Sequence, residues 1–153
     1  MNATRKKAAP ALDFNTSRFG TLSVAEDRVI SFSRGIPGFG KLRRFILIDH
    51  DREGLFKWLQ SVEDPNVAFL LTNPNAYKAD YAVPLKRAEI EELGVRDAGS
   101  VITLVMVCVS QGESKQVSLN LKGPVVFNSE NMSAMQCIVD RDDYPSSYVI
   151  RKV

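Results

Sequence analysis

The strongest structural signal in the chain is the stretch 101-VITLVMVCVSQGESKQVSLNL-121. Its first nine residues are apolar apart from Thr103, and several are β-branched, which favours a buried strand. Residues 116–121 alternate between apolar and polar side chains, so that every second one is expected to face a core. The polar residues 110–115 separate the two segments, and we therefore expect two antiparallel strands that pair across them.

Shorter segments of the same kind recur along the chain. Further strands are expected at 21–24, 28–32, 45–48, 67–71, 125–127, 136–139 and 148–150. The first two of these are expected to form a hairpin. Residues 55–59 are expected to form one helical turn, and residues 84–93 a helix that Pro84 begins and Gly94 ends.

The spacing of these elements indicates the fold class. About eight to nine short strands with frequent turn signals, and one or two short helices, predict an all-β, mainly antiparallel domain. Such a domain is built as a compact barrel or as a two-sheet sandwich. A parallel α/β sheet is not expected, because the strands do not alternate with long helices.

Charge divides the chain into a short tail and a body. The 153 residues include 20 Lys and Arg and 18 Asp and Glu, for a formal charge of +2. Without the three basic residues at 5–7, the remaining 17 basic residues face 18 acidic ones. We expect a flexible basic N-terminal tail over residues 1–15 and a single domain over residues 16–153. The near-neutral body lacks the clustered positive charge that a nucleic-acid groove needs.

Signals of membrane insertion and secretion are weak. The longest apolar run, residues 101–109, is far shorter than the ~18 residues of a membrane-spanning helix. The basic residues near the N-terminus are not followed by an apolar segment, so a secretory signal is not expected and the protein is expected in the cytoplasm. Cys108 and Cys137 lie within apolar runs and are expected to be buried, reduced thiols.

Candidate catalytic and cofactor motifs are incomplete. Residues 35–41 match the start of a phosphate-binding loop, but Leu42 stands where the motif needs a hydroxyl, and a strand instead of a helix follows. His50, between two aspartates, is either a proton carrier or, as we favour, part of a polar turn at a strand end. One histidine and two separated cysteines cannot supply the usual four-ligand zinc set. No catalytic residue, cofactor or metal site is therefore expected.

Two further groups of residues have alternative interpretations. The acidic residues at 63–64 and 140–143 can act as paired catalytic carboxylates, but such runs are more typical of solvated turns. The neighbouring aromatic residues Phe56 and Trp58 can anchor a protein interface if they are exposed, or close the end of a barrel if they are buried. We favour the second interpretation for Trp58.

Several segments, taken in order, form a specific combination of motifs. The most specific are the turn 35-GIPGF-39, the segment 58-WLQSVED-64 and the segment 120-NLKGPVV-126. Smaller matches are Phe19-Gly20, Phe32, Phe45 to Leu47, Phe56-Lys57, Ala68-Phe69, Tyr81, Asn128, Gln136 and Tyr144. Together these segments resemble the FliW family of flagellar assembly factors. The resemblance covers about residues 16–150 and implies a compact, antiparallel, β-barrel-like fold.

The resemblance also implies a function. FliW-like proteins bind the translational regulator CsrA and relieve its repression of flagellin mRNA translation. They also bind flagellin, so that the exchange of partners couples the amount of flagellin to its synthesis. The resemblance implies no enzymatic activity. From the near-neutral body and the short apolar runs we expect no direct binding of nucleic acid and no membrane association, and we expect a monomer when the protein is free. An alternative from another class is a small β-barrel that binds single-stranded RNA directly, which requires a basic groove with exposed aromatic side chains.

Residues of the resembling motifs divide into those expected to shape the barrel and those expected to meet a partner. The expected turn formers and core residues are Gly35, Pro37, Gly38, Pro124, Phe19, Phe69 and Val125. The outward-facing polar positions are the candidate partner-binding residues: Gln60, Glu63, Asp64, Asn120 and Lys122. Further acidic surface candidates are Glu89, Glu91, Glu92, Asp140, Asp142 and Asp143. An acidic surface docked beside the cationic RNA-binding face of CsrA would disfavour phosphate there without occupying the RNA site.

Overall fold

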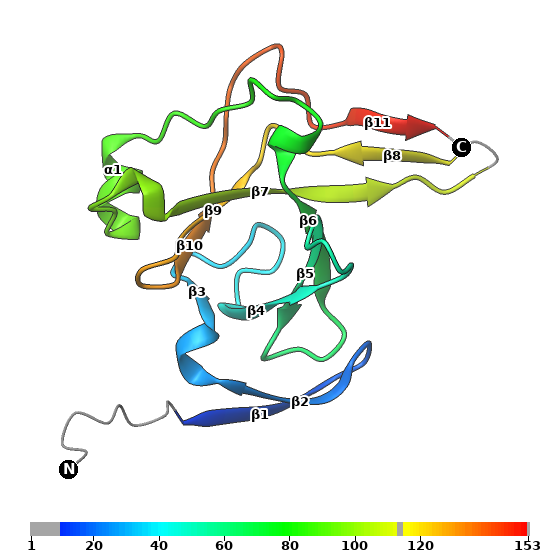
Figure 1. Ribbon diagram of the computed structural model, residues 1–153. Helices are drawn as coiled ribbons and strands as arrows, with labels where there is room; N and C mark the ends of the chain where they lie inside the picture. Colours follow the sequence, from blue (N-terminus) through cyan, green and yellow to red (C-terminus); the bar gives the residue numbers. More distant parts are fainter. Residues whose placement is uncertain (1–9, 113–114, 153) are drawn as a thin grey trace.

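The computed structural model describes residues 10–112 and 115–152 (Figure 1). Most of the regular structure consists of strands: β1 (Ala11–Thr16), β2 (Gly20–Ala25), β3 (Ile30–Phe32), β4 (Arg44–Asp49), β5 (Phe56–Ser61), β6 (Ala68–Thr72), β7 (Val101–Val109), β8 (Gln116–Leu119), β9 (Val125–Asn128), β10 (Ser133–Gln136) and β11 (Tyr148–Lys152). The described residues add the helix α1 (Arg87–Leu93) and the 3-10 turns η1 (Glu26–Arg28), η2 (Pro74–Ala76) and η3 (Ala98–Ser100). Within these residues no helix is long and apolar enough to span a bilayer.

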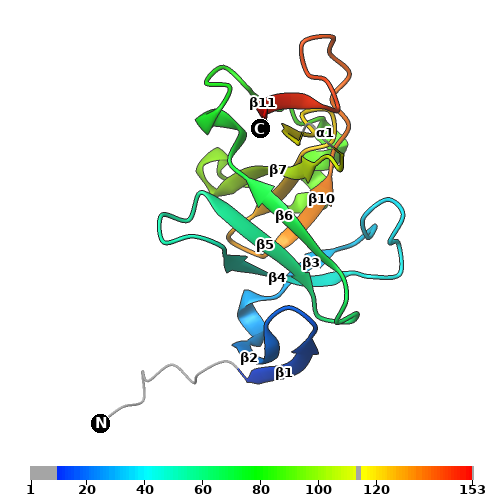
Figure 2. The same ribbon diagram turned by 90° about the vertical axis from the view of Figure 1, so that its right-hand side faces the viewer.

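Seven of the strands close into a barrel in the order β3-β4-β5-β6-β7-β9-β10 (Figures 1 and 2). The ring closes because β7 pairs with β9 through Val101–Leu104 and with β6 through Val105 and Met106. β3 and β10 run parallel, with Ser31 opposite Ser133, and the other neighbouring pairs are antiparallel. The predicted all-β, mainly antiparallel, barrel-like fold is confirmed, and the barrel is formed in place of the sandwich.

β7 is long enough to take part in two structures. Beyond the barrel, its residues Val107–Val109 pair with β8, which carries β11 on its other side (Figure 1). The predicted pairing of the segments at 101–109 and 116–121 is confirmed for this half of β7. Tyr81 and Tyr144 pack beneath the resulting three-stranded extension. β1 and β2 form a separate hairpin that lies near β4 and β5 at one end of the barrel (Figures 1 and 2).

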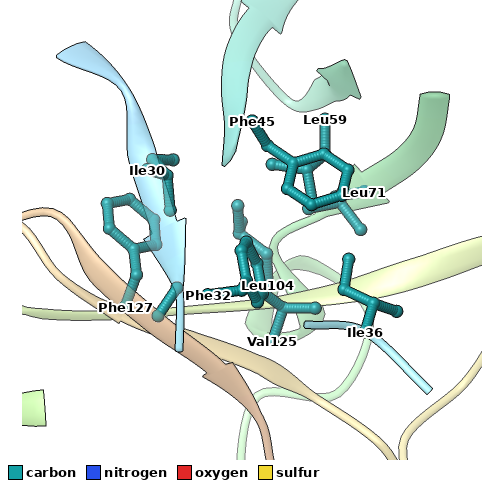
Figure 3. Packing of buried hydrophobic residues seen from close by; sticks show 10 residues of the cluster. Ile30, Phe32, Ile36, Phe45, Leu59, Leu71, Leu104, Val125 and Phe127 are labelled. Atoms are coloured by element: carbon teal, nitrogen blue, oxygen red, sulfur yellow. The ribbon is translucent and has the colours of Figure 1, made fainter. Parts of the chain in front are cut away.

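Apolar side chains from many strands fill the barrel interior. The buried residues are Ile30, Phe32, Ile36, Phe45, Leu59, Leu71, Leu104, Val125, Phe127 and Ala134 (Figure 3). Phe32 and Phe45 meet edge to face, with ring centroids 5.2 Å apart. β9 is buried on both faces, because Val125 belongs to this interior cluster while Val126 packs against Leu93 of α1. Burial on both faces explains why the first three residues of β9, 125–127, are all apolar.

The helix begins later than predicted and ends where predicted. The backbone N–H of Lys86 donates to Oε1 of Glu89 (2.7 Å), and this cap starts α1 at Arg87 instead of Pro84. Gly94 has a φ of +64°, a left-handed conformation that ends the helix and that glycine adopts without a steric penalty.

The N-terminal strands pair differently from the prediction. β2 pairs with β1 over its whole length and does not pair with β3, so the expected hairpin of 21–24 with 28–32 is wrong. The expected tail is wrong for residues 11–15, where half-buried apolar residues alternate with exposed ones and build β1. The first nine residues of that tail, including its three basic residues, lie outside the described part of the chain.

Three further expectations differ from the structure. The predicted helical turn at 55–59 is wrong, because β5 is held as a strand between β4 and β6. β10 ends at Gln136, where the predicted strand at 136–139 would begin. Cys137 is buried as expected, but Cys108 is exposed, because β7 has already left the barrel at that residue.

Candidate functional site

Two of the three family-like motifs meet at one end of the barrel. In the loop between β3 and β4, Gly35 N–H donates to Phe32 O (3.0 Å) and Phe39 N–H donates to Ile36 O (2.7 Å). Ile36 is buried in the barrel core, whereas Phe39 is 41% exposed and packs edge to face on Phe69. Phe69, an expected core residue, is only half-buried. The loop therefore closes on itself and presents an aromatic ring at the surface.

Gly35 cannot be replaced without moving this loop. Its φ is +67°, and a Cβ atom there would lie 2.7 Å from Cα and O of Gly40. Both the left-handed backbone and the close approach of two backbone segments require glycine. The expected turn-forming role of Gly35 is confirmed.

Glu63 ties the loop between β5 and β6 to the beginning of β4. Its Oε1 accepts hydrogen bonds from the backbone N–H groups of Arg43 (2.6 Å) and Arg44 (3.0 Å). Partial desolvation acts to raise the pKa of Glu63, but these two hydrogen bonds and the charges of both arginines outweigh it and hold the pKa below its usual range. The carboxylate is exposed as predicted, but one of its two oxygens is already hydrogen-bonded to backbone N–H groups of the protein.

Asp64 lies beside the same loop. Its N–H donates to Ser61 Oγ (2.9 Å), and its Oδ1 accepts from Asn66 N–H (2.9 Å). It lines a shallow hollow of about 450 Å³ together with residues 38–42 of the loop. The four residues Phe39, Lys41, Glu63 and Asp64 are named here the barrel-end patch, because they combine an exposed ring with charges of both signs.

Gln60 was expected to face outward, and this expectation is wrong. The side chain is fully buried, and its Nε2 donates to the backbone oxygens of Ser61 (3.0 Å), Pro65 (3.4 Å) and Val67 (3.2 Å). The turn between β1 and β2 is fixed over this region, since Ser17 N–H donates to Pro65 O (2.9 Å). Gln60 thus organises the loop that carries Glu63 and Asp64 and does not itself reach the surface.

The third motif forms the turn between β8 and β9. Oδ1 of Asn120 accepts from the N–H groups of Lys122 (3.2 Å) and Gly123 (3.1 Å), and Gly123 O accepts from Gln136 Nε2 (2.8 Å). Asn120 is half-buried and shapes the turn, whereas the Lys122 side chain is exposed. Of the two candidates in this motif, Lys122 has the side chain available to a partner.

The acidic residues of α1 are largely engaged within the protein. Glu92 forms an ion pair with Arg34 (2.8 Å), and Glu91 lies 3.6 Å from Arg87 on the same helix. Glu89, the third of them, is the residue that caps the helix. Exposed pairs of this kind contribute little to stability, but they reduce the net negative charge that the helix presents.

In the acidic loop before β11, residues 140–143, fewer of the carboxylates are paired with a basic side chain than on α1. Asp143 forms a two-point contact with Arg141 (2.8 and 2.9 Å), and this hydrogen bonding lowers the pKa of Asp143. Asp140 and Asp142 are exposed, and neither has an assigned ion pair or hydrogen bond within the described residues. The predicted acidic groups therefore lie on three separate elements, and these two aspartates carry the most available charge.

A polar and aromatic cluster around Trp58 was not predicted. Trp58 Nε1 donates to His50 Nδ1 (3.1 Å), the Arg18 guanidinium lies 4.1 Å from the indole centroid, and Phe19 packs edge-on at 6.4 Å. Trp58 and Phe19 are both half-buried, so neither is the core residue that we expected. The hairpin of β4 and β5 brings His50 near Trp58. The spacing of these two residues along the hairpin is the sequence feature that could have predicted their contact.

Comparisons with known proteins place these motifs in one family. The family described as FliW protein matches residues 13–150. The flagellar assembly factor FliW of Caldanaerobacter subterraneus is 35% identical over 134 residues, which cover 87% of this chain and 89% of the relative. The flagellar assembly factor FliW of Caldicellulosiruptor saccharolyticus is 36% identical over 132 residues, which cover 86% of this chain and 86% of the relative.

A solved structure agrees with this assignment. A crystal structure of the flagellar assembly factor FliW superposes with a TM-score of 0.80 at 27% identity, covering 90% of this chain and 96% of the other. The family match over residues 13–150 includes all three motifs. The chain belongs to the FliW family of flagellar assembly factors.

Proposed function

We propose that this chain is a non-enzymatic, cytoplasmic flagellar assembly factor that exchanges between two protein partners, CsrA and flagellin. Binding to CsrA relieves its repression of flagellin mRNA translation, and free flagellin competes for the factor. The match to the FliW family over residues 13–150 carries this proposal. Partner exchange then links the supply of flagellin to its synthesis without any catalytic step.

The barrel-end patch and Lys122 are the surfaces that best suit partner binding. Phe39 is a large exposed aromatic side chain with charged neighbours, a composition that is enriched at protein interfaces. Asp64 and Lys122 place polar groups of opposite charge on motif positions, whereas Gln60 and Asn120 act by holding the loops in shape. The proposal therefore assigns direct contact to Phe39, Asp64 and Lys122.

The antagonism of CsrA is proposed to be electrostatic. CsrA must present cationic surface to RNA, and negative charge held near that surface disfavours phosphate binding. Asp140 and Asp142 supply exposed charge for this effect, and Glu63 and Asp64 add to it. By linkage, bound RNA must lower the affinity of CsrA for this protein by the same ratio by which this protein lowers the affinity of CsrA for RNA.

A titration tests this proposal. The purified protein is added to CsrA carrying fluorescently labelled flagellin leader RNA, with and without flagellin from the same organism. We expect RNA to be released by the factor and rebound when flagellin is added. Binding to flagellin alone would restrict the function to that of a flagellin chaperone, and binding to neither protein would contradict the proposal.

Matched variants sharpen the titration. Phe39→Ala and Asp64→Asn should weaken binding to at least one partner, whereas Ile138→Ala should not. Ile138 is 64% exposed and lies outside all three motifs, so it controls for the loss of any surface apolar side chain. Equal binding by all three variants would exclude the barrel-end patch as the interface.

Direct binding of single-stranded RNA is the second candidate. One observation favours it: the Arg18 guanidinium stacks over half-exposed Trp58, an arrangement that can also receive a base. The same titration without CsrA distinguishes the two candidate functions. RNA binding by this protein alone that is lost in Trp58→Ala would favour direct RNA binding.

A further inference from the structure

The barrel is open at the end where β3 begins, away from the barrel-end patch. Ile102 of β7 stands opposite Phe127 of β9, which is one of the buried interior residues. Opposed residues of paired strands lie on the same face of a sheet, so Ile102 also points into the barrel. It is nevertheless 38% exposed, whereas Leu104, the next residue of β7 on that face, is 5% exposed. The interior is therefore covered at Leu104 and open to solvent at Ile102.

Charged residues surround this opening. On the inward face of β4, Asp49 follows Leu47, and on that of β5, Lys57 precedes Leu59. Lys57 Nζ lies 2.6 Å from Asp49 Oδ1, so these two charges neutralise each other. Arg28, two residues before β3, also lies at the opening and is exposed. Its guanidinium has no ion-pair or hydrogen-bond partner among residues 10–112 and 115–152.

A cavity of about 450 Å³ occupies the opening. The barrel lines it with Ile30, Ile102 and Phe127, and half-buried Leu22 and Val24 of β2 line it from the N-terminal hairpin. Two separate elements thus enclose one apolar space. Its volume is in the range of small-molecule sites, which are frequent in the mouths of β-barrels.

One residue that lines the cavity has a strained backbone. Met132 has a φ of +60° and is the one non-glycine residue of the described chain with a positive φ. Its N–H donates to Asn128 O (2.7 Å) and its carbonyl accepts from Ser31 N–H (2.9 Å), which hold it in this conformation. Strained residues cluster at ligand sites, and the flexible methionine side chain adapts to irregular ligands. The fold therefore holds an adaptable side chain at the opening.

We infer that this cavity, named here the barrel mouth, binds an amphipathic carboxylate. The aliphatic chain of the ligand lies against the apolar lining, and its carboxylate pairs with Arg28. Charge complementarity selects this head group, because Arg28 is the charge at the opening without a partner, whereas Asp49 is already neutralised by Lys57. The inference goes beyond the proposed exchange of protein partners and does not depend on it.

The lining of the barrel mouth favours an alkyl chain over a polypeptide segment. In the described chain, its polar side chains are Arg28, Asp49 and Lys57, and the others are apolar. A peptide would carry main-chain N–H and C=O groups into a space with few hydrogen-bond partners, and each unpaired group would weaken binding. An aliphatic chain has no such groups.

Nuclear magnetic resonance of the methionine methyl groups tests binding directly. The chain has four methionines, of which Met132 lines the barrel mouth and Met135 is buried against α1 on the other face of β10. Sodium decanoate is the probe. It should shift the Met132 methyl resonance with saturation and leave that of Met135 unchanged. No shift at up to about 1 mM decanoate, or equal shifts of both resonances, would overturn the inference.

Ligand and protein variants test the two parts of the proposed contact. From octanoate to decanoate, affinity should rise about fourfold for each added CH₂ group, because each one is buried. Arg28→Gln should weaken decanoate binding about tenfold and leave the binding of neutral 1-decanol unchanged. Arg52→Gln removes an exposed arginine that does not line the cavity and should change neither. Equal decanoate affinity in Arg28→Gln and the wild-type protein would refute the assignment of the carboxylate.

A larger side chain at the opening tests the location. Ile102→Trp should fill the barrel mouth and abolish decanoate binding. Because Ile102 is already partly exposed, thermal denaturation should show that this variant remains folded. Ile138→Trp is the matched control, since it places the same ring at a 64% exposed position outside the cavity. Undiminished binding by Ile102→Trp would mean that the ligand binds elsewhere and would contradict the inference.

Discussion

Gly35 is the residue whose replacement the barrel-end loop should tolerate least. We predict that Gly35→Ala lowers the free energy of unfolding by more than about 2 kcal/mol, because a left-handed alanine costs ~1–2 kcal/mol and its Cβ would also meet the Gly40 backbone. Urea denaturation measures the change. Gly40→Ala is the matched control, since a Cβ there has open space and no positive φ is involved. Similar losses in the two variants would contradict this account of the loop.

Glu63 should make the stability of the fold depend on pH. Its pKa is lower in the folded protein than the ordinary value of 4.5, so its contribution is complete above that value and is lost as the pH falls through the lower, folded pKa. Glu63→Gln should therefore destabilise the protein at pH 7 by about 1 kcal/mol, a small value because the side chain is exposed.

The pH dependence separates this effect from a general loss of packing. The difference in stability between the wild-type protein and Glu63→Gln should shrink as the pH is lowered below 4.5. Thermal denaturation across this range measures it. Glu53→Gln removes an exposed carboxylate with no assigned partner in the described chain and should show neither effect. A difference that is constant with pH would argue against the proposed hydrogen bonds.

At the scale of elements, α1 depends on contacts from another part of the chain. A helix of seven residues is too short to be stable alone in water. Its last carbonyls accept hydrogen bonds from fully buried Asn128, whose Nδ2 donates to Leu93 O (3.0 Å) and Gly94 O (3.2 Å). Nδ2 of Asn131 also donates to Leu93 O (3.0 Å). The turn after β9 therefore fixes the end of the helix.

We predict that Asn128→Ala destabilises the protein by about 2–3 kcal/mol, because it removes a fully buried side chain together with its hydrogen bonds to Leu93 O and Gly94 O and the one that its Oδ1 accepts from Glu130 N–H. Asn131→Ala, at an exposed position, should cost less, about 1 kcal/mol. Hydrogen exchange should show faster opening of α1 than of β5 in the Asn128 variant. Uniform acceleration across both elements would indicate that α1 does not open separately from the barrel.

At the scale of the whole molecule, the distribution of charge should govern the proposed effect on CsrA. We predict that Asp140→Asn with Asp142→Asn reduces the release of RNA from CsrA by about threefold at low salt, and that about 0.5 M salt removes the difference. Neither aspartate has an assigned partner in the part of the chain that the structure describes, so thermal stability should not change. RNA competition measured by fluorescence anisotropy supplies the readout.

Variants of the other acidic groups complete this test. Glu92→Gln removes the ion pair with Arg34, so any change in RNA release must be compared with its change in stability. Unaltered RNA release after neutralising all three acidic groups would refute the electrostatic form of the mechanism and would leave steric exclusion of RNA as the remaining explanation.

Local patterns were sufficient for much of the architecture. The apolar runs at 45–48, 67–71, 101–109 and 125–127 predicted strands that the structure contains, and Gly94 predicted the end of α1. A buried strand requires a run of apolar side chains, and a left-handed helix end favours glycine, so both signals reside in a few consecutive residues. The three motifs that identified the family are local in the same sense.

The remaining features of the architecture depend on pairing between segments that are distant in the sequence. The partner of β2 and the point where β7 leaves the barrel depend on competition between strand pairings that no short window of sequence contains. Gln60 shows the consequence for the candidate site: its polar character predicted a surface residue, but a turn more than 40 positions earlier in the chain lies against the same loop. Whether a polar side chain binds a partner or supports the fold depends on what covers it, and long-range packing determines that cover.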